Sequence, residues 1–494
     1  MRSQRKGWIL GMATILFVLY LLLLIPDPIA PVPLAQNKEP FAWNRDEYWS
    51  SLESRFKEAR TKDCTDLSSS VTWRLSQVDS LCERFETDLL SPAEPVFGEV
   101  ETNFFELGVL LAACPSTISE YMRSFGRLRD ALKGQSVHWD MDSKAGRDCI
   151  YRLLYGGRIA VEEAILQSPQ GAVSQALVEA NAPSETPSAT ILGVAIHSGD
   201  ILVSRGGAPT SALIARGNDY PGNFSHVALL YVDESTGIVS IIESHIEKGV
   251  GLASVADYLG DTKLRVMILR VRSDLPPLQA NPMLPHKAAK YMFERARFGH
   301  IPYDFAMDTQ DNSKMFCSEV ASEAYNHFGV RLWAGLSNIS SAGARTWLSA
   351  FGVRNFITQE PSDLEYDPQL CVIAEWRDYE TLYKDHLDNA VVDIMLESAD
   401  NGAPLGYDWY MLPVARVAKV YSAILNKFGA VGPVPEGMTA TAALQNRWFS
   451  RLHEDTVKRL RILAQQFQQS HGYSPPYWEL VKLARQAYMS SAEG

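Results

Sequence analysis

The amino-acid sequence predicts an α+β protein in which a small, mainly antiparallel sheet with its own helices is flanked by helical regions and preceded by one N-terminal transmembrane helix. Three observations predict this class. An uncharged apolar run covers residues 7–26, helix-spaced apolar residues cover 41–180 and 351–494, and four short β-branched runs lie between residues 200 and 271. With 46% hydrophobic and 21% charged residues, the chain has the composition of a folded protein.

The charge balance argues against one class of partner. The chain carries 58 acidic and 46 basic residues, a formal net charge of -12, and has no concentrated cationic run. Phosphate backbones are bound by clustered lysine and arginine. We therefore expect no nucleic-acid partner.

The N-terminal apolar run has the length of a membrane span. Residues 7–26 (GWILGMATILFVLYLLLLIP) form ~30 Å of helix at ~1.5 Å per residue, the thickness of a hydrocarbon core. Arg2, Arg5 and Lys6 precede the run, and the next basic residue is Lys38. The positive-inside rule then predicts a single-pass anchor in the cytoplasmic (inner) membrane.

This topology places residues 1–6 in the cytoplasm and the bulk of the chain on the extracytoplasmic, periplasmic side. The alternative is a cleaved secretory signal, whose apolar region is usually shorter, ~7–15 residues. Both interpretations export the rest of the chain.

Composition divides the exported part into five segments. Residues 27–40 are a proline-rich stalk, 41–180 a helical region, and 181–192 a linker rich in Pro, Ser and Thr. Residues 193–350 form the predicted catalytic domain, and 351–494 a mainly helical C-terminal region.

Four of the six cysteines, Cys64, Cys82, Cys114 and Cys149, fall in the helical region. In an oxidising compartment an even number of cysteines indicates one or two disulfides, whose connectivity the spacing leaves open. The alternative is that some of them are small buried apolar residues.

The predicted sheet and its helices follow from a change of periodicity after the linker. Short β-branched runs bounded by turn residues predict strands at 200–204, 226–232, 238–244 and 264–271. Helix-spaced residues that end at a glycine predict helices at 285–298 and 315–328.

Cys317 is the candidate nucleophile. It falls in the first turn of the predicted helix 315–328, behind the possible N-cap residues Asn312 and Ser313. The positive end of a helix dipole lowers the pKa of a thiol, and only the thiolate attacks a carbonyl carbon efficiently. The backbone N–H groups of Cys317 and Ser318 also point to where an oxyanion forms.

His226 is the candidate base, at the start of a predicted hairpin. If the turn occupies residues 233–236, His226 stands opposite Glu243, close enough for a hydrogen bond that orients the imidazole. A register longer by two residues places His245 opposite instead, on the same face. Either residue is therefore a candidate third member of the site.

Five short segments occur in an order that resembles a known family. They are 199–202 (GDIL), 224–228 (FSHVA), 242–249 (IESHIEKG), 302–305 (PYDF) and 316–319 (FCSE). They resemble the permuted papain-like amidases, the YiiX-like branch of the NlpC-type cysteine hydrolases. The resemblance implies a circularly permuted papain-like fold, with the histidine before the cysteine.

Carried over by residue, the resemblance implies Cys317 as nucleophile, His226 as base, Glu243 as third catalytic residue and Tyr303 near the substrate. It covers roughly residues 199–329. We expect no metal and no organic cofactor, because acyl transfer through a thioester requires neither.

Three functions remain open. Relatives cleave cell-wall peptide amides, which implies an envelope amidase, whereas the lecithin:retinol acyltransferase branch implies a lipid acyl hydrolase or acyltransferase. The third is a non-catalytic binding or scaffold protein. Fold membership indicates a reaction class and leaves the substrate and the oligomeric state undetermined.

Two long apolar patterns in the C-terminal region predict helices, at 408–428 and 443–469. The first is rich in aromatic and aliphatic residues. We expect it to pack against the catalytic domain, with a position near lipid as the alternative.

Overall fold

The computed structural model of the chain describes residues 12, 14–15, 17–29, 31–32, 40–178 and 182–492. The predicted cytoplasmic segment 1–6 lies outside the described residues, and the predicted anchor (7–26) and stalk (27–40) lie partly outside them. The described residues from 12 to 23 are helical and exposed or half-buried. Within the described part of the chain, no helix is both long and apolar enough to cross a membrane.

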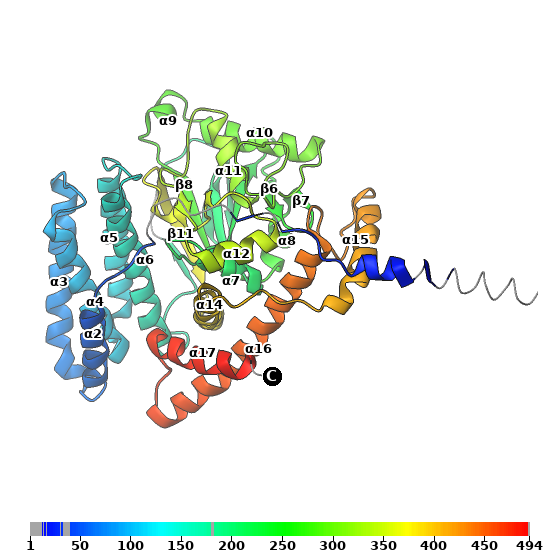
Figure 1. The fold of residues 1–494 in the computed structure, drawn as a ribbon. Helices are drawn as coiled ribbons and strands as arrows, with labels where there is room; N and C mark the ends of the chain where they lie inside the picture. The colour runs from blue at the N-terminus through cyan, green and yellow to red at the C-terminus, as the bar shows by residue number, and fades with distance from the viewer. Residues whose placement is uncertain are drawn as a thin grey trace, which may run out of the picture.

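The predicted helical region is a bundle at one side of the molecule (Figure 1). Its helices are α2 (Asp46–Ala59), α3 (Cys64–Thr87), α4 (Pro95–Ala113), α5 (Ile118–Ser136) and α6 (Lys144–Leu166). Their apolar stripes share one core, and the side chains of Asp63 and Ser143 cap α3 and α6.

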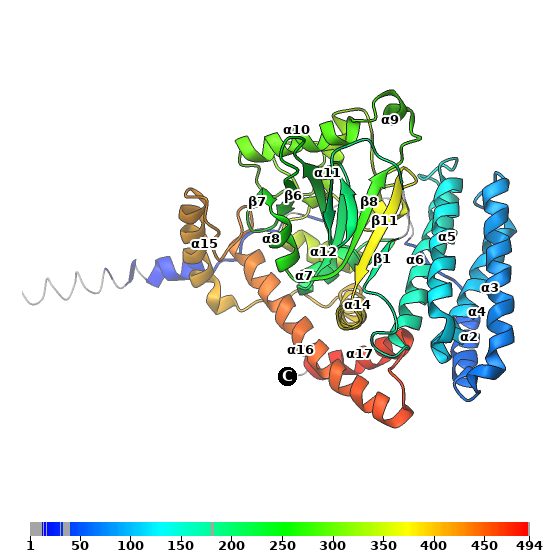
Figure 2. The same ribbon diagram turned by 180° about the vertical axis from the view of Figure 1, so that it is seen from behind.

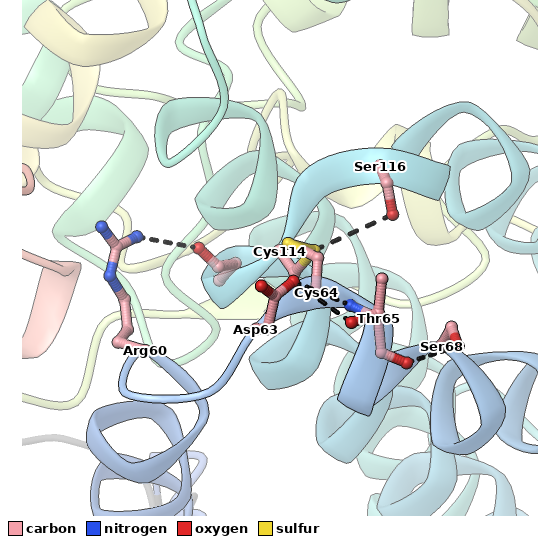
Figure 3. The surroundings of a disulfide bond; sticks show 8 residues. Arg60, Asp63, Cys64, Thr65, Ser68, Cys114 and Ser116 are labelled. Atoms are coloured by element: carbon pink, nitrogen blue, oxygen red, sulfur yellow. Dashed lines mark hydrogen bonds between the residues drawn. A yellow bond between two sulfur atoms is a disulfide. The ribbon is translucent and has the colours of Figure 1, made fainter.

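One disulfide, Cys64–Cys114, joins the start of α3 to the end of α4 (Figure 3). Cys82 and Cys149 are free and buried. The prediction of a disulfide therefore holds for Cys64 and Cys114, and the alternative, small buried apolar residues, holds for Cys82 and Cys149.

Among the described residues, the main sheet has seven strands, all paired antiparallel, in the order β1-β11-β8-β4-β5-β6-β7. Its strands are β1 (Ala176–Val178), β4 (Ile201–Gly206), β5 (His226–Val232), β6 (Val239–His245), β7 (Gly249–Ala253), β8 (Lys263–Val271) and β11 (Leu370–Arg377). The antiparallel sheet of the predicted fold class is confirmed, and the four predicted strands correspond to β4, β5, β6 and β8.

The sheet extends past both predicted limits of the catalytic domain, 193 and 350. Strand β11 lies about twenty residues beyond the second limit and pairs with β8, and β1 comes from the end of the predicted helical region. These pairings are non-local, so local periodicity does not reveal them.

The predicted linker 181–192 is also partly a strand. β2 (Ser188–Ile191) pairs with β3 (Val194–His197). Leu192 and Gly193 between them both have positive φ, 49° and 82°. Two such residues make the tight turn that a right-twisted hairpin requires.

Both faces of the sheet are buried. Val227 and Leu229 of β5 share a core with α10 (Leu284–Phe298) and α11 (Cys317–Asn326), whereas Ala228 and Leu230 pack into a second core on the opposite face. Two buried faces account for the uninterrupted apolar sequence of this strand.

Long helices of the C-terminal region lie below the sheet and at the side of the molecule away from the bundle (Figure 2). The remaining helices are α7 (Pro209–Arg216), α8 (Val255–Gly260), α9 (Pro276–Ala280), α12 (Ala342–Phe351), α13 (Asp363–Tyr366), α14 (Tyr379–Asp400), α15 (Leu412–Asn426), α16 (Ala440–His471) and α17 (Tyr477–Ala492), with short strands β9 (Ser337–Asn338) and β10 (Ile357–Thr358). Figures 1 and 2 show α15 beside the N-terminal helix, across the molecule from the bundle.

Candidate active site

Hydrogen bonds hold several of the sequence motifs together at one end of the sheet. The N–H of Val250 donates to the carbonyl of Ile301 at 2.9 Å, and the N–H of Met315 donates to the carbonyl of Pro302 at 3.0 Å. The hydroxyl of Ser244 donates to the carbonyl of Met315 at 2.6 Å. The β6–β7 hairpin, the loop that carries Tyr303 and the start of α11 therefore form one cluster.

Cys317 is the first residue of α11. The N-cap is Phe316, and neither Asn312 nor Ser313 caps the helix, so that part of the prediction is wrong. Asp311 holds Ser313 in a separate turn, through a 3.1 Å bond from the Ser313 N–H to its side chain. The helix is instead capped by Glu319, whose carboxylate accepts from the N–H of Phe316 at 2.9 Å.

The thiol of Cys317 lies against the backbone on both sides of His226. Its Sγ is 3.9 Å from the carbonyl oxygen of Ser225, to which it donates. The backbone N–H of Val227, one residue past His226, hydrogen-bonds to the sulfur and favours its ionised form. Helix α11 thus brings the predicted nucleophile to the start of β5, where the predicted base begins the strand.

The ionisation of Cys317 is opposite to the expectation from the helix dipole. Burial raises the pKa of the thiol to about 11, although hydrogen bonds from Val227 and Ser318 act in the lowering direction. Desolvation of the thiolate outweighs the favourable helix terminus. The resting residue is therefore a neutral thiol, and its activation requires a base.

The hairpin that carries His226 has the longer of the two predicted registers. Ala228 stands opposite Glu243, so the register that places Glu243 opposite His226 is wrong. The loop is longer than the predicted turn because the side chain of Asp233 accepts from the N–H groups of Ser235 and Thr236 and the strands close only at Ile238. Continued by two residues, the observed register brings His245 opposite His226.

Glu243 nevertheless contacts both histidines. Its carboxylate oxygens are 2.9 Å from Nε2 of His226 and 2.8 Å from Nε2 of His245. The two imidazole rings stack with centroids 5.2 Å apart. The two candidates for the third member of the site therefore lie in one hydrogen-bonded group.

The protonation states of this group follow from its contacts. Burial acts to raise the pKa of Glu243, but hydrogen bonds from His226 and His245 hold it well below its usual range. Burial lowers the pKa of His226, against the opposing effect of Glu243. An ionised carboxylate only accepts, so Nε2 of His226 carries the hydrogen and Nδ1 of the neutral ring has the free lone pair.

A small pocket of about 90 Å³ adjoins Cys317. Tyr303 lines it, together with apolar side chains from distant elements, namely Leu213, Ile214, Leu348, Phe351, Val353 and Met438. The pocket thus contains the predicted nucleophile, the residue predicted to lie near the substrate and an apolar wall.

Glu360 in this pocket was missed by sequence reasoning. The residue is buried, and burial raises its pKa to about 8, so the carboxyl is neutral at pH 7. Its Oε2 has no hydrogen-bond partner among the described residues. Glu360 follows the two-residue strand β10, and no local pattern relates it to Cys317.

A larger cavity of about 460 Å³ lies in the helical bundle, lined by aromatic residues such as Phe41, Trp43 and Tyr155. Its described lining includes no cysteine, serine, threonine or histidine. Of these two cavities, the smaller one contains the predicted nucleophile Cys317.

His226, Glu243 and His245 could also hold a metal ion, because their ligand atoms lie within 4.8 Å of one another. Each Nε2 here donates to the carboxylate instead. The three side chains thus form one hydrogen-bonded group.

A cysteine at a helix start, packed against the backbone on both sides of a strand histidine that hydrogen-bonds to a carboxylate, is the arrangement expected of a papain-like cysteine hydrolase, here in permuted order. Residues 195–373 match the family model described as permuted papain-like amidase enzyme, YaeF/YiiX, C92 family. The predicted family is confirmed over this segment, and the match supports the prediction of a cysteine hydrolase. No significant match was found among curated proteins or among solved structures.

Proposed function

We propose that the protein is a cysteine amidase in which Cys317 is the nucleophile, His226 the general base and Glu243 the residue that orients the base. One observation carries the proposal: the sulfur lies against the residues on both sides of His226, while Glu243 holds the far nitrogen of that ring.

The reaction follows from the neutral resting thiol. Nδ1 of His226 accepts the thiol proton as Sγ bonds to the carbonyl carbon, and the C=O π electrons move to the oxygen. Collapse of this tetrahedral species breaks the C–N bond, and the amine leaves with the proton from His226. Water, deprotonated by His226, then cleaves the thioester and restores the thiol.

The first turn of α11 offers N–H groups that can stabilise the oxyanion. The first N–H groups of a helix have no partner within it, and those of Cys317 and Ser318 belong to the first turn of α11. Tyr303 contacts the substrate from the pocket wall in this proposal.

For the substrate, we propose amide bonds of envelope molecules. The proposal includes the anchor at residues 7–26 in the cytoplasmic membrane, with the catalytic domain on the extracytoplasmic side. The support is the uncharged apolar sequence with basic residues before it.

The apolar wall of the pocket favours a second candidate. The apolar side chains named above line it beside the proposed nucleophile, together with Ile246 and Phe305. Such a wall suits the alkyl part of an acyl group, as a lipid acyl hydrolase or acyltransferase requires.

The experiment that tests the centre is trapping of the acyl-enzyme. Full-length protein is incubated with peptidoglycan fragments or with acyl lipids, quenched in acid and analysed by intact mass. We expect a mass increase on Cys317 that identifies the acyl group and is absent in Cys317→Ala. Cys371→Ala is the matched control, because Cys371 is also a free cysteine but lies on β11 outside the pocket.

No adduct with any substrate, combined with reactivity of Cys317 toward an electrophilic probe no greater than in denatured protein, would favour the scaffold alternative. An adduct that persists in Cys317→Ala would contradict the assignment of the nucleophile.

A further inference from the structure

Helix α15 presents an apolar stripe that no described residue covers. Val414, Val417, Tyr421, Ile424 and Phe428 follow one another at three- and four-residue spacing on one side of the helix and its C-terminal end. Their exposed fractions include 67% for Val417 and 81% for Phe428. Folded proteins rarely expose so large a continuous patch without a function.

The opposite side of α15 accounts for its stability. Leu412, Ala415 and Ser422 are buried, and α15 packs along α16. The hydroxyl of Ser422 also accepts from the N–H of Val434 at 2.9 Å. The buried face of α15 therefore packs mainly on α16, within the C-terminal region and not on the catalytic domain as expected, and the stripe is the other face.

The charged residues of α15 and of the segment after it, up to residue 435, are all basic, and one of them, Arg416, forms an ion pair with Asp27 at 3.6 Å. Arg416, Lys419 and Lys427 occur between residues 409 and 435, and that stretch contains no aspartate or glutamate. The chain as a whole has a net charge of -12. A locally basic helix on an acidic protein is complementary to an anionic surface.

The stripe adjoins a second exposed apolar element. Arg416 donates to the carbonyl oxygens of Leu22, at 3.1 Å, and Ile25, at the end of the N-terminal helix. Asp27 accepts from the N–H and hydroxyl of Thr441 at 3.0 Å each, next to the start of α16. These contacts fix the N-terminal helix beside α15, as both ribbon views show (Figures 1 and 2).

The N-terminal helix is itself apolar and exposed. Phe17 and Ile25 are 61% and 56% exposed. Two adjacent apolar helices, one of them flanked by basic residues, share a single side of the molecule.

We propose that α15 lies in the interface of an anionic phospholipid bilayer, with its apolar stripe among the acyl chains and the exposed Lys419 and Lys427 at the headgroups. A helix of 15 residues is ~22 Å long, shorter than a hydrocarbon core of ~30 Å, so it lies in the plane of the interface. Trp409 and Tyr410, both exposed and just before α15, are of the types enriched at headgroup level.

This surface is connected to the candidate active site. Val434 and Met438, from the segment after α15, pack with Ile246 and Phe305. Met438, Ile246 and Phe305 also line the pocket of Cys317. Docking of α15 therefore holds one wall of the catalytic pocket close to lipid.

The test measures the depth of a spin label at Ile424 in full-length protein reconstituted into vesicles of phosphatidylethanolamine and phosphatidylglycerol. Ile462→Cys is the matched control for Ile424→Cys, because both are helical isoleucines with exposed fractions of 55% and 52%. Ile462 lies in the second half of α16, which runs away from α15 (Figure 1). Protein without the added cysteine, carried through the same labelling, measures the background from native thiols.

We expect the label at 424 to collide more with oxygen and several-fold less with an aqueous nickel chelate than the label at 462. Charge reversal in Lys419→Glu/Lys427→Glu is expected to return the 424 label toward water. Equal aqueous access at the two positions would overturn the proposal. Shielding of the 424 label from both reagents would also overturn it, because protein would then cover the stripe. The measurement involves no turnover, so its result is independent of the proposed catalytic centre.

Discussion

Glu243 accepts a hydrogen bond from His226 although the two residues do not face each other across the hairpin. The carboxylate reaches diagonally along one face of the two strands, because successive side chains on a face are two residues apart. The same carboxylate also accepts from His245, so three titratable side chains respond together to any change in one of them.

Substitution of the two candidate third residues should shift the pKa of His226 in opposite directions. Glu243 raises that pKa and His245 lowers it. We expect Glu243→Gln to lower the pKa of His226 and to reduce kcat/KM by roughly 100-fold or more, because the imidazolium loses its counter-charge. His245→Gln should raise the pKa and cost less activity. Titration of the His226 ring by NMR, together with the pH–rate profile, measures both, and equal shifts in one direction would contradict the arrangement.

The thiol of Cys317 should show no reactivity plateau near neutral pH. Burial raises its pKa to about 11, so the thiolate fraction, and with it the rate of alkylation by iodoacetamide, should increase about tenfold per pH unit between pH 6 and 9. Mass spectrometry of Cys317 alkylation over this range gives the rates. A constant rate from pH 5 to 8 would instead indicate a preformed thiolate and imidazolium pair.

Glu360 should limit activity at alkaline pH. Its pKa of about 8 keeps the carboxyl neutral at pH 7, and ionisation above pH 8 places a negative charge near Cys317, where it acts to raise the pKa of the thiol. We expect wild-type kcat/KM to decrease above pH 8 and Glu360→Gln to lack that decrease, because the amide does not titrate. If kcat/KM of the variant decreased above pH 8 as in the wild type, the decrease would belong to another titrating group.

The backbone at Gly249 should tolerate no side chain. Its φ is +72°, and a Cβ would lie 2.1 Å from the carbonyl oxygen of Ile301. Gly237 is a matched control, because its φ is +70° and a Cβ there would meet nothing within 4 Å. We expect Gly237→Ala to cost about 1 kcal/mol of the free energy of unfolding from backbone strain, and Gly249→Ala to cost clearly more. Denaturant unfolding of both variants measures the difference, and equal losses would show that the contact with Ile301 relaxes.

The disulfide should stabilise the helical bundle. Cys64 and Cys114 are separated by 50 residues, and opening a loop of that size costs about 2–4 kcal/mol of stability. We expect Cys64→Ser/Cys114→Ser to lower the Tm measured by calorimetry. Cys82→Ala controls for the loss of a buried cysteine outside the bond, and a loss in this control as large as that of the double variant would assign the effect to packing.

Sequence patterns were most informative where one element carries its own signal. Local apolar spacing alone was enough to predict the strands β4, β5, β6 and β8 and the helices α10 and α11. Strands β1 and β11 escaped this reasoning because a three-residue strand has almost no period and because β11 pairs with β8 across about a hundred residues of chain. Long-range pairing is decided by which surfaces are left to bury, which no local window contains.

For the candidate site, the residue types and their order along the chain determined the class of chemistry: a cysteine at a helix start and a histidine at a strand start, with acid and histidine alternatives on the next strand. Tertiary structure decided the rest. Burial by surrounding elements made Cys317 a neutral thiol despite its helix terminus, loop closure at Ile238 shifted the register by two residues, and Glu360 joined the pocket from a distant segment. Desolvation, register and long-range contacts depend on what surrounds a residue in space, and that environment exists only once the chain has folded.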